Sequence, residues 1–314
     1  MANAIRQVYG ETLAALGGAR PDIVVLDADV SSSTQSKFFA RAHPERFFNM
    51  GIAEANMTAT AAGLAQQGFT PFVNTFAVFL ASIGLIPTRA LACYGDLNVK
   101  LAGAYCGLSD AFDGASHHAA EDLAALRALP NLKILCPADA VSAAALTGLA
   151  ADTPGPCYLR LSRDVYPDLY PAGTKFQVGG GSVVRRGSDV TVLACGLLVH
   201  KALEAAQALE AEGISVQVAD LYSIKPIDRE LILRCAAGTG AVVTAEEHSV
   251  TGGLGSAVAE VLVRSGTPVP VEMVGVGDTF TESGPYPQLL AKYGLDAPAV
   301  AAAVRAVLAR KGAA

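Results

Sequence analysis

Short runs of consecutive apolar residues recur along the whole chain, and Ala- and Leu-rich helical windows separate them. In the first half, strands are expected near residues 23–30, 71–76, 99–105, 133–137 and 157–162. Helices are expected near residues 4–17, 53–67, 77–93, 119–129 and 138–151. Continuous rather than alternating apolar strands indicate a sheet that is covered on both faces, which favours parallel pairing. The pattern therefore predicts an α/β layer architecture.

The same alternation returns after an interruption that is rich in Pro, Gly and Tyr. We interpret residues 166–188 as an interdomain linker that runs into the edge of a second unit. Strands of that unit are expected near residues 190–196, 214–221, 241–247 and 269–276, and helices near residues 199–212, 228–237, 253–265 and 298–310. The prediction is thus two doubly wound domains with mainly parallel sheets, residues 1–165 and residues 189–314.

Composition excludes several classes of protein. The formal net charge of -6 leaves no basic stripe that could neutralise a run of phosphates, so no nucleic-acid partner is expected. No apolar stretch reaches membrane-spanning length, and the first residues lack the apolar segment of a signal peptide. The six cysteines are scattered and form no CxxC motif, which is typical of a reducing compartment. We therefore expect a cytoplasmic protein without membrane contacts.

The most unusual segment surrounds Glu54. This residue follows a Gly-Ile-Ala turn and opens a helix that has almost no charge from Ala55 to Ala65, which indicates a buried helix. Glu54 either simply favours the helix N-terminus or is a buried carboxylate that needs a specific partner. Phe76 and Phe79 follow, expected on one helical face; alone they indicate core packing.

Two further segments carry polar residues at the ends of predicted elements. The loop at residues 107–122 holds two adjacent histidines and several carboxylates. It is interpreted as a surface turn, as a substrate-facing loop, or as a metal site built on His118 and Asp122, for which only two ligands are local. Arg163 follows the last strand of the first domain, where such sheets bind ligands; it suits an anionic group or a surface salt bridge.

Taken in order, these segments resemble the transketolase family. The series is a Gly-x-x-Glu helix, Thr-Phe-x-x-Phe, Asp-Gly-x-Ser-His, Pro-Ala-Asp and Leu-Ser-Arg, and it covers the chain together with residues 246–257 of the second half. The first domain is similar to that family's pyrimidine-binding domain and the second to its C-terminal domain. The resemblance implies the C-terminal subunit of a split transketolase, which moves a two-carbon ketol unit from a ketose to an aldose.

The resemblance also implies thiamine diphosphate as the cofactor. Glu54 matches the glutamate that hydrogen-bonds N1′ of the aminopyrimidine and favours its imino tautomer, a catalytic role. Phe79 matches the residue that stacks on the pyrimidine ring, and Phe76 lines the same pocket. Asp29 matches an acidic residue near the thiazolium.

Substrate-binding residues follow from the same resemblance. His117 matches a catalytic histidine that hydrogen-bonds sugar hydroxyls, and Asp113 matches the carboxylate that reads sugar stereochemistry. Arg163, Arg6 and Ser33 match positions that grip a terminal phosphate. The expected substrate is therefore a phosphorylated or otherwise anionic sugar.

Two residues depart from the family pattern at the substrate end. Tyr105 stands where the family usually has a phosphate-contacting histidine, and Phe112 stands where it usually has glutamate. A tyrosine hydroxyl donates one hydrogen bond but carries no positive charge at pH 7. We therefore expect an unusual sugar or a differently charged terminus.

The diphosphate and Mg²⁺ site of the family is missing. The family builds it from Gly-Asp-Gly followed further along by Asn, and residues 95–97 and 277–279 do not fit that pattern. No metal ligand is thus expected in this chain, and an N-terminal transketolase subunit is expected to supply the Mg²⁺ site. The implied assembly is α2β2, in which the helix at residues 50–64 is either part of the interface or internal core.

Other interpretations stay open. The β subunit of a 2-oxoacid dehydrogenase shares this two-domain plan and cofactor, and a deoxyxylulose-phosphate synthase fragment is related. A non-catalytic binding subunit that has kept the fold is a further alternative. A dinucleotide-binding oxidoreductase is disfavoured, because no GxGxxG motif follows a strand and opens a helix.

Overall fold

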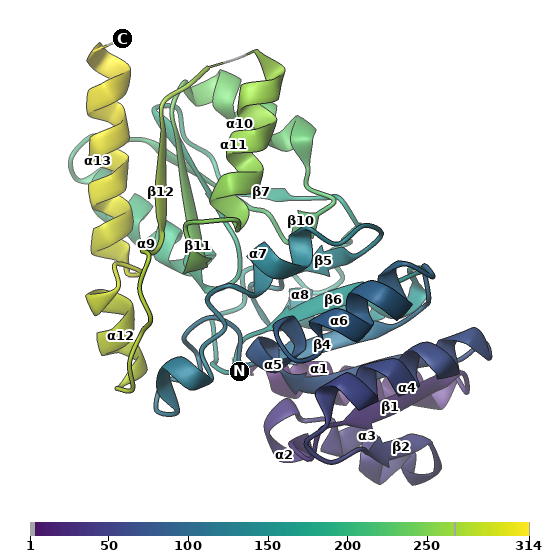
Figure 1. Ribbon diagram of the computed structural model, residues 1–314. Coiled ribbons are helices and arrows are strands. Elements are labelled where there is room, and N and C mark those ends of the chain that lie inside the picture. The colour runs from purple at the N-terminus through teal and green to yellow at the C-terminus, as the bar shows by residue number, and fades with distance from the viewer. Residues whose placement is uncertain (1–3, 267, 314) are drawn as a thin grey trace.

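The first domain is built on a seven-stranded sheet. The computed structural model describes residues 4–266 and 268–313, and in Figure 1 this domain occupies the lower right. The strand order is β10-β5-β6-β4-β3-β1-β2, and every pairing is parallel except that of β10 with β5. Its strands are β1 (Ile23–Asp27), β2 (Phe47–Asn49), β3 (Thr70–Phe76), β4 (Lys100–Ala104), β5 (Lys133–Leu135), β6 (Cys157–Leu161) and β10 (Ser223–Lys225).

Helices lie on both faces of this sheet. They are α1 (Ile5–Ala19), α2 (Ser31–Thr34), α3 (Lys37–Ala42), α4 (Glu54–Gln66), α5 (Ala77–Ala81), α6 (Leu85–Pro87), α7 (Asp122–Arg127) and α8 (Ala140–Asp152). Every residue of β1, β3, β4 and β6 is buried. The expectation from continuous apolar strands is therefore confirmed.

The second domain repeats the plan with five strands in the order β12-β11-β8-β9-β7. These are β7 (Ser182–Arg185), β8 (Val190–Ala194), β9 (Val216–Asp220), β11 (Val242–Ser249) and β12 (Val271–Val276). The helices are α9 (Leu197–Glu210), α10 (Arg229–Thr239), α11 (Leu254–Ser265), α12 (Tyr286–Lys292) and α13 (Ala297–Ala313). Only the edge strand β7 is antiparallel to its neighbour. The predicted class, two mainly parallel α/β domains, is confirmed.

One short strand from the second half of the chain belongs to the sheet of the first domain. Strand β10 follows β9 of the second domain in sequence, but it pairs with β5 at the edge of the first sheet. In the other direction, β7 lies inside the segment interpreted as a linker and pairs with β9. The two sheets are therefore tied together by backbone hydrogen bonds as well as by the connecting chain.

Buried charges also join the domains. Arg160 on β6 donates hydrogen bonds of 2.8 and 3.0 Å to the Asp122 carboxylate and one of 2.9 Å to the Glu247 carbonyl on β11. The Glu247 carboxylate in turn accepts a 2.7 Å bond from the Leu108 amide. Burial raises the pKa of Glu247 to about 7, while Arg160 opposes that shift. A paired polar network thus crosses the seam between the domains.

The single helix expected at residues 77–93 is wrong. The chain instead forms α5, then α6, then a π-helical segment at Thr88–Cys93. Pro87 lacks a backbone N–H, so an α-helical hydrogen bond cannot form there. Gly84 lies close to the Leu80 carbonyl, and a Cβ at this position would lie 2.9 Å from that oxygen. The interruption places Phe79 in the short first piece.

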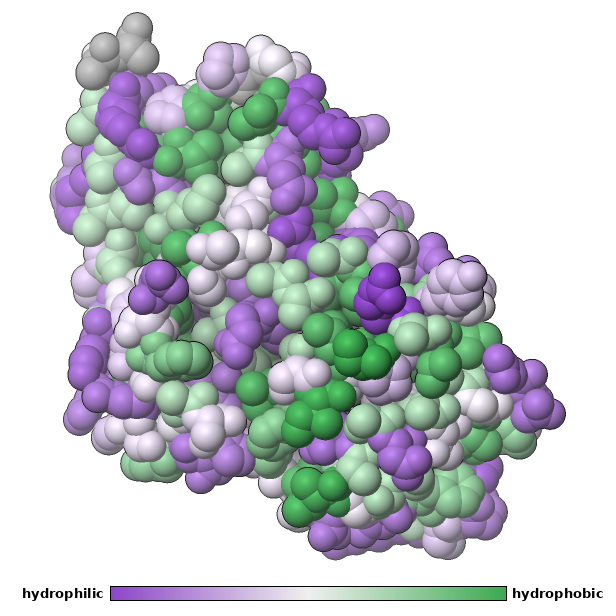
Figure 2. Space-filling view, viewed as in Figure 1, coloured by the Kyte–Doolittle hydropathy of each residue, from purple (hydrophilic) through white to green (hydrophobic). Residues whose placement is uncertain are grey.

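Helix α4 is buried on one face only, so the expectation of a buried helix is wrong for this single chain. Met57, Ala61 and Ala62 are buried, whereas Ala55 and Gly63 are exposed. Helix α6 and the π-helical segment pack beside α4, and large apolar side chains there are strongly exposed: Ile52 at 82%, Ile86 at 70% and Tyr94 at 89%. Figure 2 shows apolar surface gathered over the lower half of the molecule, where α4, α5 and α6 lie.

No helix within the described ranges is long and apolar enough to cross a membrane.

Candidate active site

The site lies where the central strands of the first sheet end. The parallel register aligns Phe76 at the end of β3 with Ala104 on β4, and Ala104 with Leu161 on β6. The residues that follow these strands, including Tyr105 and Arg163, therefore emerge at one edge. Carboxyl ends of parallel strands are the usual ligand-binding edge of such sheets.

Glu54 has the specific partner that its position requires. It is the first residue of α4 and is buried, and its Oε1 accepts a 3.2 Å hydrogen bond from the hydroxyl group of Thr75 on β3. Thr75 is itself buried. This threonine opens the Thr-Phe-x-x-Phe motif, but no role for it was expected from the motif alone.

Four rings form the aromatic cluster, which consists of Phe76, Phe79, Tyr105 and His117. Phe76 stacks on Tyr105 with centroids 4.8 Å apart, and it lies 6.0 Å from Phe79. The His117 ring meets Phe76 and Phe79 edge-on at 5.9 and 5.3 Å. The expected single helical face for the two phenylalanines is wrong, since Phe76 ends β3 and Phe79 belongs to α5. The two rings nonetheless meet.

Two arginines converge on Tyr105. Arg6 on α1 donates 2.8 Å hydrogen bonds to the Tyr105 hydroxyl group and to the Ser33 carbonyl. The guanidinium carbons of Arg6 and Arg163 lie 5.2 and 5.1 Å from the Tyr105 ring centroid, within cation–π range. Ser33 is thus near the predicted anion site, where its backbone oxygen holds Arg6.

Asp110 is a site residue that the sequence reasoning missed. Its Oδ1 forms a 3.1 Å ion pair with Arg163, and only 1% of its side chain is exposed. Burial raises the pKa of Asp110 to about 6; neighbouring Asp113 adds to the shift and Arg163 opposes it. The only signal was its membership of the carboxylate-rich loop.

The remaining predicted residues are exposed or separate. Asp113 and Phe112 are exposed at the tip of the loop. His117 is half-buried and its Nδ1 lies 3.0 Å from the Ser116 hydroxyl group. Asp29 is exposed at the same strand edge and accepts a 2.7 Å hydrogen bond from Asn49. Within the described residues, no hydrogen bond joins Asp29 to the aromatic cluster.

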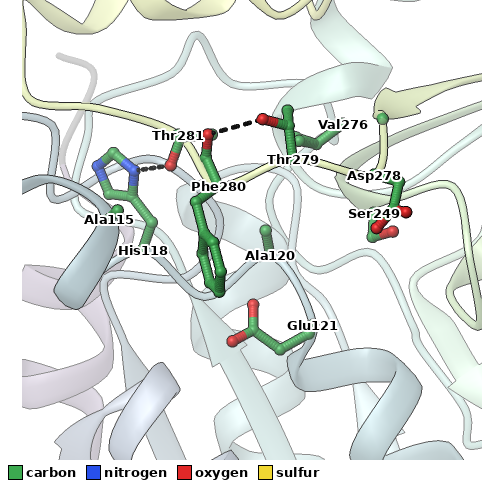
Figure 3. A pocket seen from close by; sticks show the side chains of 11 residues that line it. Ala115, His118, Ala120, Glu121, Ser249, Val276, Asp278, Thr279, Phe280 and Thr281 are labelled. Atoms are coloured by element: carbon green, nitrogen blue, oxygen red, sulfur yellow. Dashed lines mark hydrogen bonds between the residues drawn. The ribbon is translucent and has the colours of Figure 1, made fainter.

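His118 and Asp122, the two local residues of the metal alternative, have separate partners. Asp122 is paired with Arg160, and the Nδ1 of His118 lies 2.5 Å from the Thr281 hydroxyl group. His118 lines a cavity of about 400 Å³ at the domain seam, and Figure 3 shows Phe280 beside the same cavity. Across residues 4–266 and 268–313, no group of three or more His, Cys, Asp or Glu side chains is placed to hold a metal ion.

The comparisons with known proteins decide the family. The model for the transketolase pyrimidine-binding domain matches residues 2–168, and the model for the transketolase C-terminal domain matches residues 179–300. The chain belongs to the transketolase family. It corresponds to the C-terminal part of that family's proteins, and the family as a whole uses thiamine diphosphate with a divalent metal.

Relatives differ in how much of their length this chain spans. It is 40% identical to a transketolase C-terminal section of Methanocaldococcus jannaschii over 95% of this chain and 94% of that protein. It is 38% identical to a 6-deoxy-6-sulfo-D-fructose transketolase subunit of Clostridium sp. strain MSTE9, over 98% and 95% of the two chains. It is 39% identical to the transketolase of Homo sapiens over 98% of its own length but only 49% of the human protein. The chain thus spans about half of a full-length transketolase.

A solved structure is similar over the whole chain. A split-gene transketolase, described as an inactive β4 tetramer, is 51% identical and has a TM-score of 0.90. The match covers 99% of this chain and 100% of the other.

Proposed function

We propose that this chain is the C-terminal subunit of a split, thiamine-diphosphate-dependent transketolase. In the proposed reaction a ketose gives up a two-carbon ketol unit and an aldose receives it. The observation that carries the proposal is that buried Glu54 is hydrogen-bonded to Thr75, the residue just before Phe76 of the aromatic cluster, at the carboxyl edge of the first sheet.

The residues present fit the pyrimidine end of thiamine diphosphate. Glu54 is an acceptor held in place by Thr75, and half-buried Phe79 retains ring surface for stacking. When bound, the cofactor supplies a thiazolium that takes up the electron pair of the breaking carbon–carbon bond. Glu54 holds or moves a proton at N1′ of the aminopyrimidine. Asp29 is proposed to lie near the thiazolium end.

The remaining residues act on the sugar. His117 hydrogen-bonds sugar hydroxyl groups, and Asp113 reads their stereochemistry from the exposed loop. Arg6 and Arg163, with Ser33 and Tyr105 beside them, bind the far end of a phosphorylated or otherwise anionic sugar. A similarity to a subunit that acts on a sulfonated sugar supports an anionic terminus.

A separate N-terminal subunit completes the site and supplies the diphosphate and Mg²⁺ contacts. The similar solved structure is described as an inactive β4 tetramer, which is an assembly of β chains. That description supports the proposal that a second type of chain is needed for activity. The proposed active form is α2β2, in which the exposed apolar side chains beside α4 are covered by a neighbouring subunit. We further propose a cytoplasmic location, supported by six cysteines that are all free and buried.

The test is to purify the native complex through a tag on this chain and to identify its partner. We expect a stoichiometric second polypeptide, bound thiamine diphosphate, and transfer of a ketol unit between sugars. Recovery of this chain alone, together with absence of cofactor, would contradict the proposal. Oxidative decarboxylation of a 2-oxoacid by the complex would replace it with the dehydrogenase alternative.

A further inference from the structure

The polar cluster around Tyr105 is fixed before any substrate arrives. Arg6 is held by the Ser33 carbonyl and by the Tyr105 hydroxyl group, each at 2.8 Å. Tyr105 itself has a backbone φ of +59°, in the left-handed region that non-glycine residues rarely adopt. Such strain persists only where surrounding contacts over-determine it, and it concentrates at functional sites.

Arg163 is already neutralised by a carboxylate. Its Nη1 lies 3.1 Å from Oδ1 of Asp110, and Asp110 is almost completely buried. A buried carboxylate cannot turn away to water, so this negative charge stays beside the guanidinium. The pKa of Asp110, raised by burial to about 6, still leaves the group mostly ionised at pH 7.

Asp164 follows Arg163 in the sequence and is half-buried. Burial raises the pKa of Asp164, and the positive charges of Arg163 and Arg6 oppose that rise. The ion pair with Asp110 offsets one of the two guanidinium charges beside Tyr105. Tyr105 adds hydrogen-bonding capacity without charge.

We infer that Asp110 is a specificity-determining residue that sets this end of the site for a sugar terminus with at most one negative charge. The inference rests on the proposed function and narrows its substrate class. A phosphate ester is largely a dianion at pH 7, and it needs an excess of positive charge to offset its lost hydration and the repulsion by Asp110. A sulfonate, a carboxylate or a hydroxyl group still finds donors on Arg163 and Tyr105 while meeting less repulsion.

The first experiment compares acceptors in the purified complex. Hydroxypyruvate is the common donor; it passes on its two-carbon unit and releases CO₂. The acceptors are one aldose, its terminal phosphate and its terminal sulfonate. For the wild type we expect kcat/KM with the phosphate to be no higher than with the sulfonate. For Asp110→Asn, which keeps an oxygen opposite Arg163, we expect the phosphate-to-sulfonate ratio to rise by about tenfold or more.

The control removes one negative charge far from this cluster. Glu230→Gln alters an exposed carboxylate on α10 that faces Arg234, and it is expected to leave the ratio unchanged. A wild-type preference for the phosphate overturns the inference. So does an Asp110→Asn variant in which the ratio does not move.

A binding measurement separates this inference from the proposed function. Inorganic phosphate and methanesulfonate are titrated into the same complexes by calorimetry at pH 7.5. We expect Asp110→Asn to tighten phosphate binding by about tenfold and methanesulfonate binding by less. If this holds but no acceptor receives a ketol unit, the proposed function fails while the charge assignment stands. If transfer occurs but Asp110→Asn leaves phosphate affinity unchanged, the charge assignment alone fails.

Discussion

The hydroxyl group of Thr75 donates a 3.2 Å hydrogen bond to the carboxylate of Glu54, so a strand residue fixes the first residue of a neighbouring helix. Both side chains are buried. Among the residues that the structure describes, Glu54 has no ion-pair partner. The hydrogen bond therefore orients a carboxylate that stays available to a ligand nitrogen. Positioning of this kind is what a proton-holding group in a site requires.

Replacing Glu54 with Gln is expected to abolish most turnover while leaving the fold intact. The amide is nearly the same size and still accepts a bond from Thr75, but it cannot hold or release a proton. Loss of a general acid–base group typically costs about 10²–10⁴-fold in rate. The measurements are kcat of the purified complex and the thermal unfolding midpoint.

Thr75 offers a matched pair of controls for that experiment. Thr75→Ser keeps the donor and should retain most activity, whereas Thr75→Val removes it and should lower kcat more than it changes the KM for sugar. Rescue by serine distinguishes positioning of Glu54 from simple packing. Wild-type turnover in Glu54→Gln would remove Glu54 from its catalytic role.

Phe79→Leu is expected to weaken thiamine diphosphate binding by roughly tenfold. Leucine fills part of the space but offers no ring face, and a stacked aromatic pair contributes about 0.5–1.5 kcal/mol beyond its buried area. Cofactor titration of the apo complex, followed by the appearance of activity, measures the change. Phe69→Leu alters a partly exposed ring before β3 and serves as the control. Equal cofactor affinities in the two variants would argue against stacking.

Ile86→Asp is expected to break the assembly. The side chain is 70% exposed in the single chain, next to the exposed face of α4, and a charge there cannot be buried cheaply in a subunit interface. Sedimentation velocity should show smaller particles than the wild type, together with loss of activity. Val263→Asp, at an equally apolar and 82% exposed position on α11, should leave the mass unchanged. An unchanged mass for Ile86→Asp would place the interface elsewhere.

Asp220 is expected to make the stability of the chain depend on pH. This carboxyl group is buried on β9 and accepts a 2.7 Å hydrogen bond from Tyr170, and burial raises its pKa to about 8. Because the folded state holds the proton while the unfolded state loses it near pH 4, unfolding releases a proton across pH 4–8. The contribution of Asp220 to the free energy of unfolding therefore falls as pH rises through that range.

Asp220→Asn removes this dependence and keeps an acceptor for Tyr170. Relative to the wild type, the variant should gain stability steadily between pH 5 and pH 8 in urea unfolding. Asp152→Asn, at an exposed carboxylate, should follow the wild-type curve. Parallel curves for Asp220→Asn and the wild type would show that the folded pKa of Asp220 is not raised.

The elements that the sequence predicted well are those fixed by their own composition. Strands such as β1 and β8 are almost entirely apolar and fully buried, and the order of such runs along the chain determined the fold class. The missed strands, β2, β7 and β10, have three or four residues each and take their conformation from the neighbour with which they pair. The helix expected at residues 77–93 is broken at residues 82–84, just before Pro87, which has no backbone N–H to donate to the Ile83 carbonyl.

The site shows the same division. Motifs selected Glu54, Phe79 and His117 as candidate site residues, because family resemblance depends on local order. Asp110 was missed because its role depends on an ion pair with Arg163, which lies 53 residues away in the chain. Only the fold shows which carboxylate of a loop reaches a given guanidinium group.

The position of β10 in the first sheet has a consequence for any attempt to divide the protein. A fragment that stopped in the segment before β8 would keep strands β1–β6 but expose the edge of β5, whose backbone groups pair with β10 in the whole chain. Unpaired strand edges recruit other strands, so such a fragment should aggregate. The remaining fragment would carry β10 with no sheet to join. Buried apolar residues of both domains pack into shared clusters as well, so neither domain is autonomous.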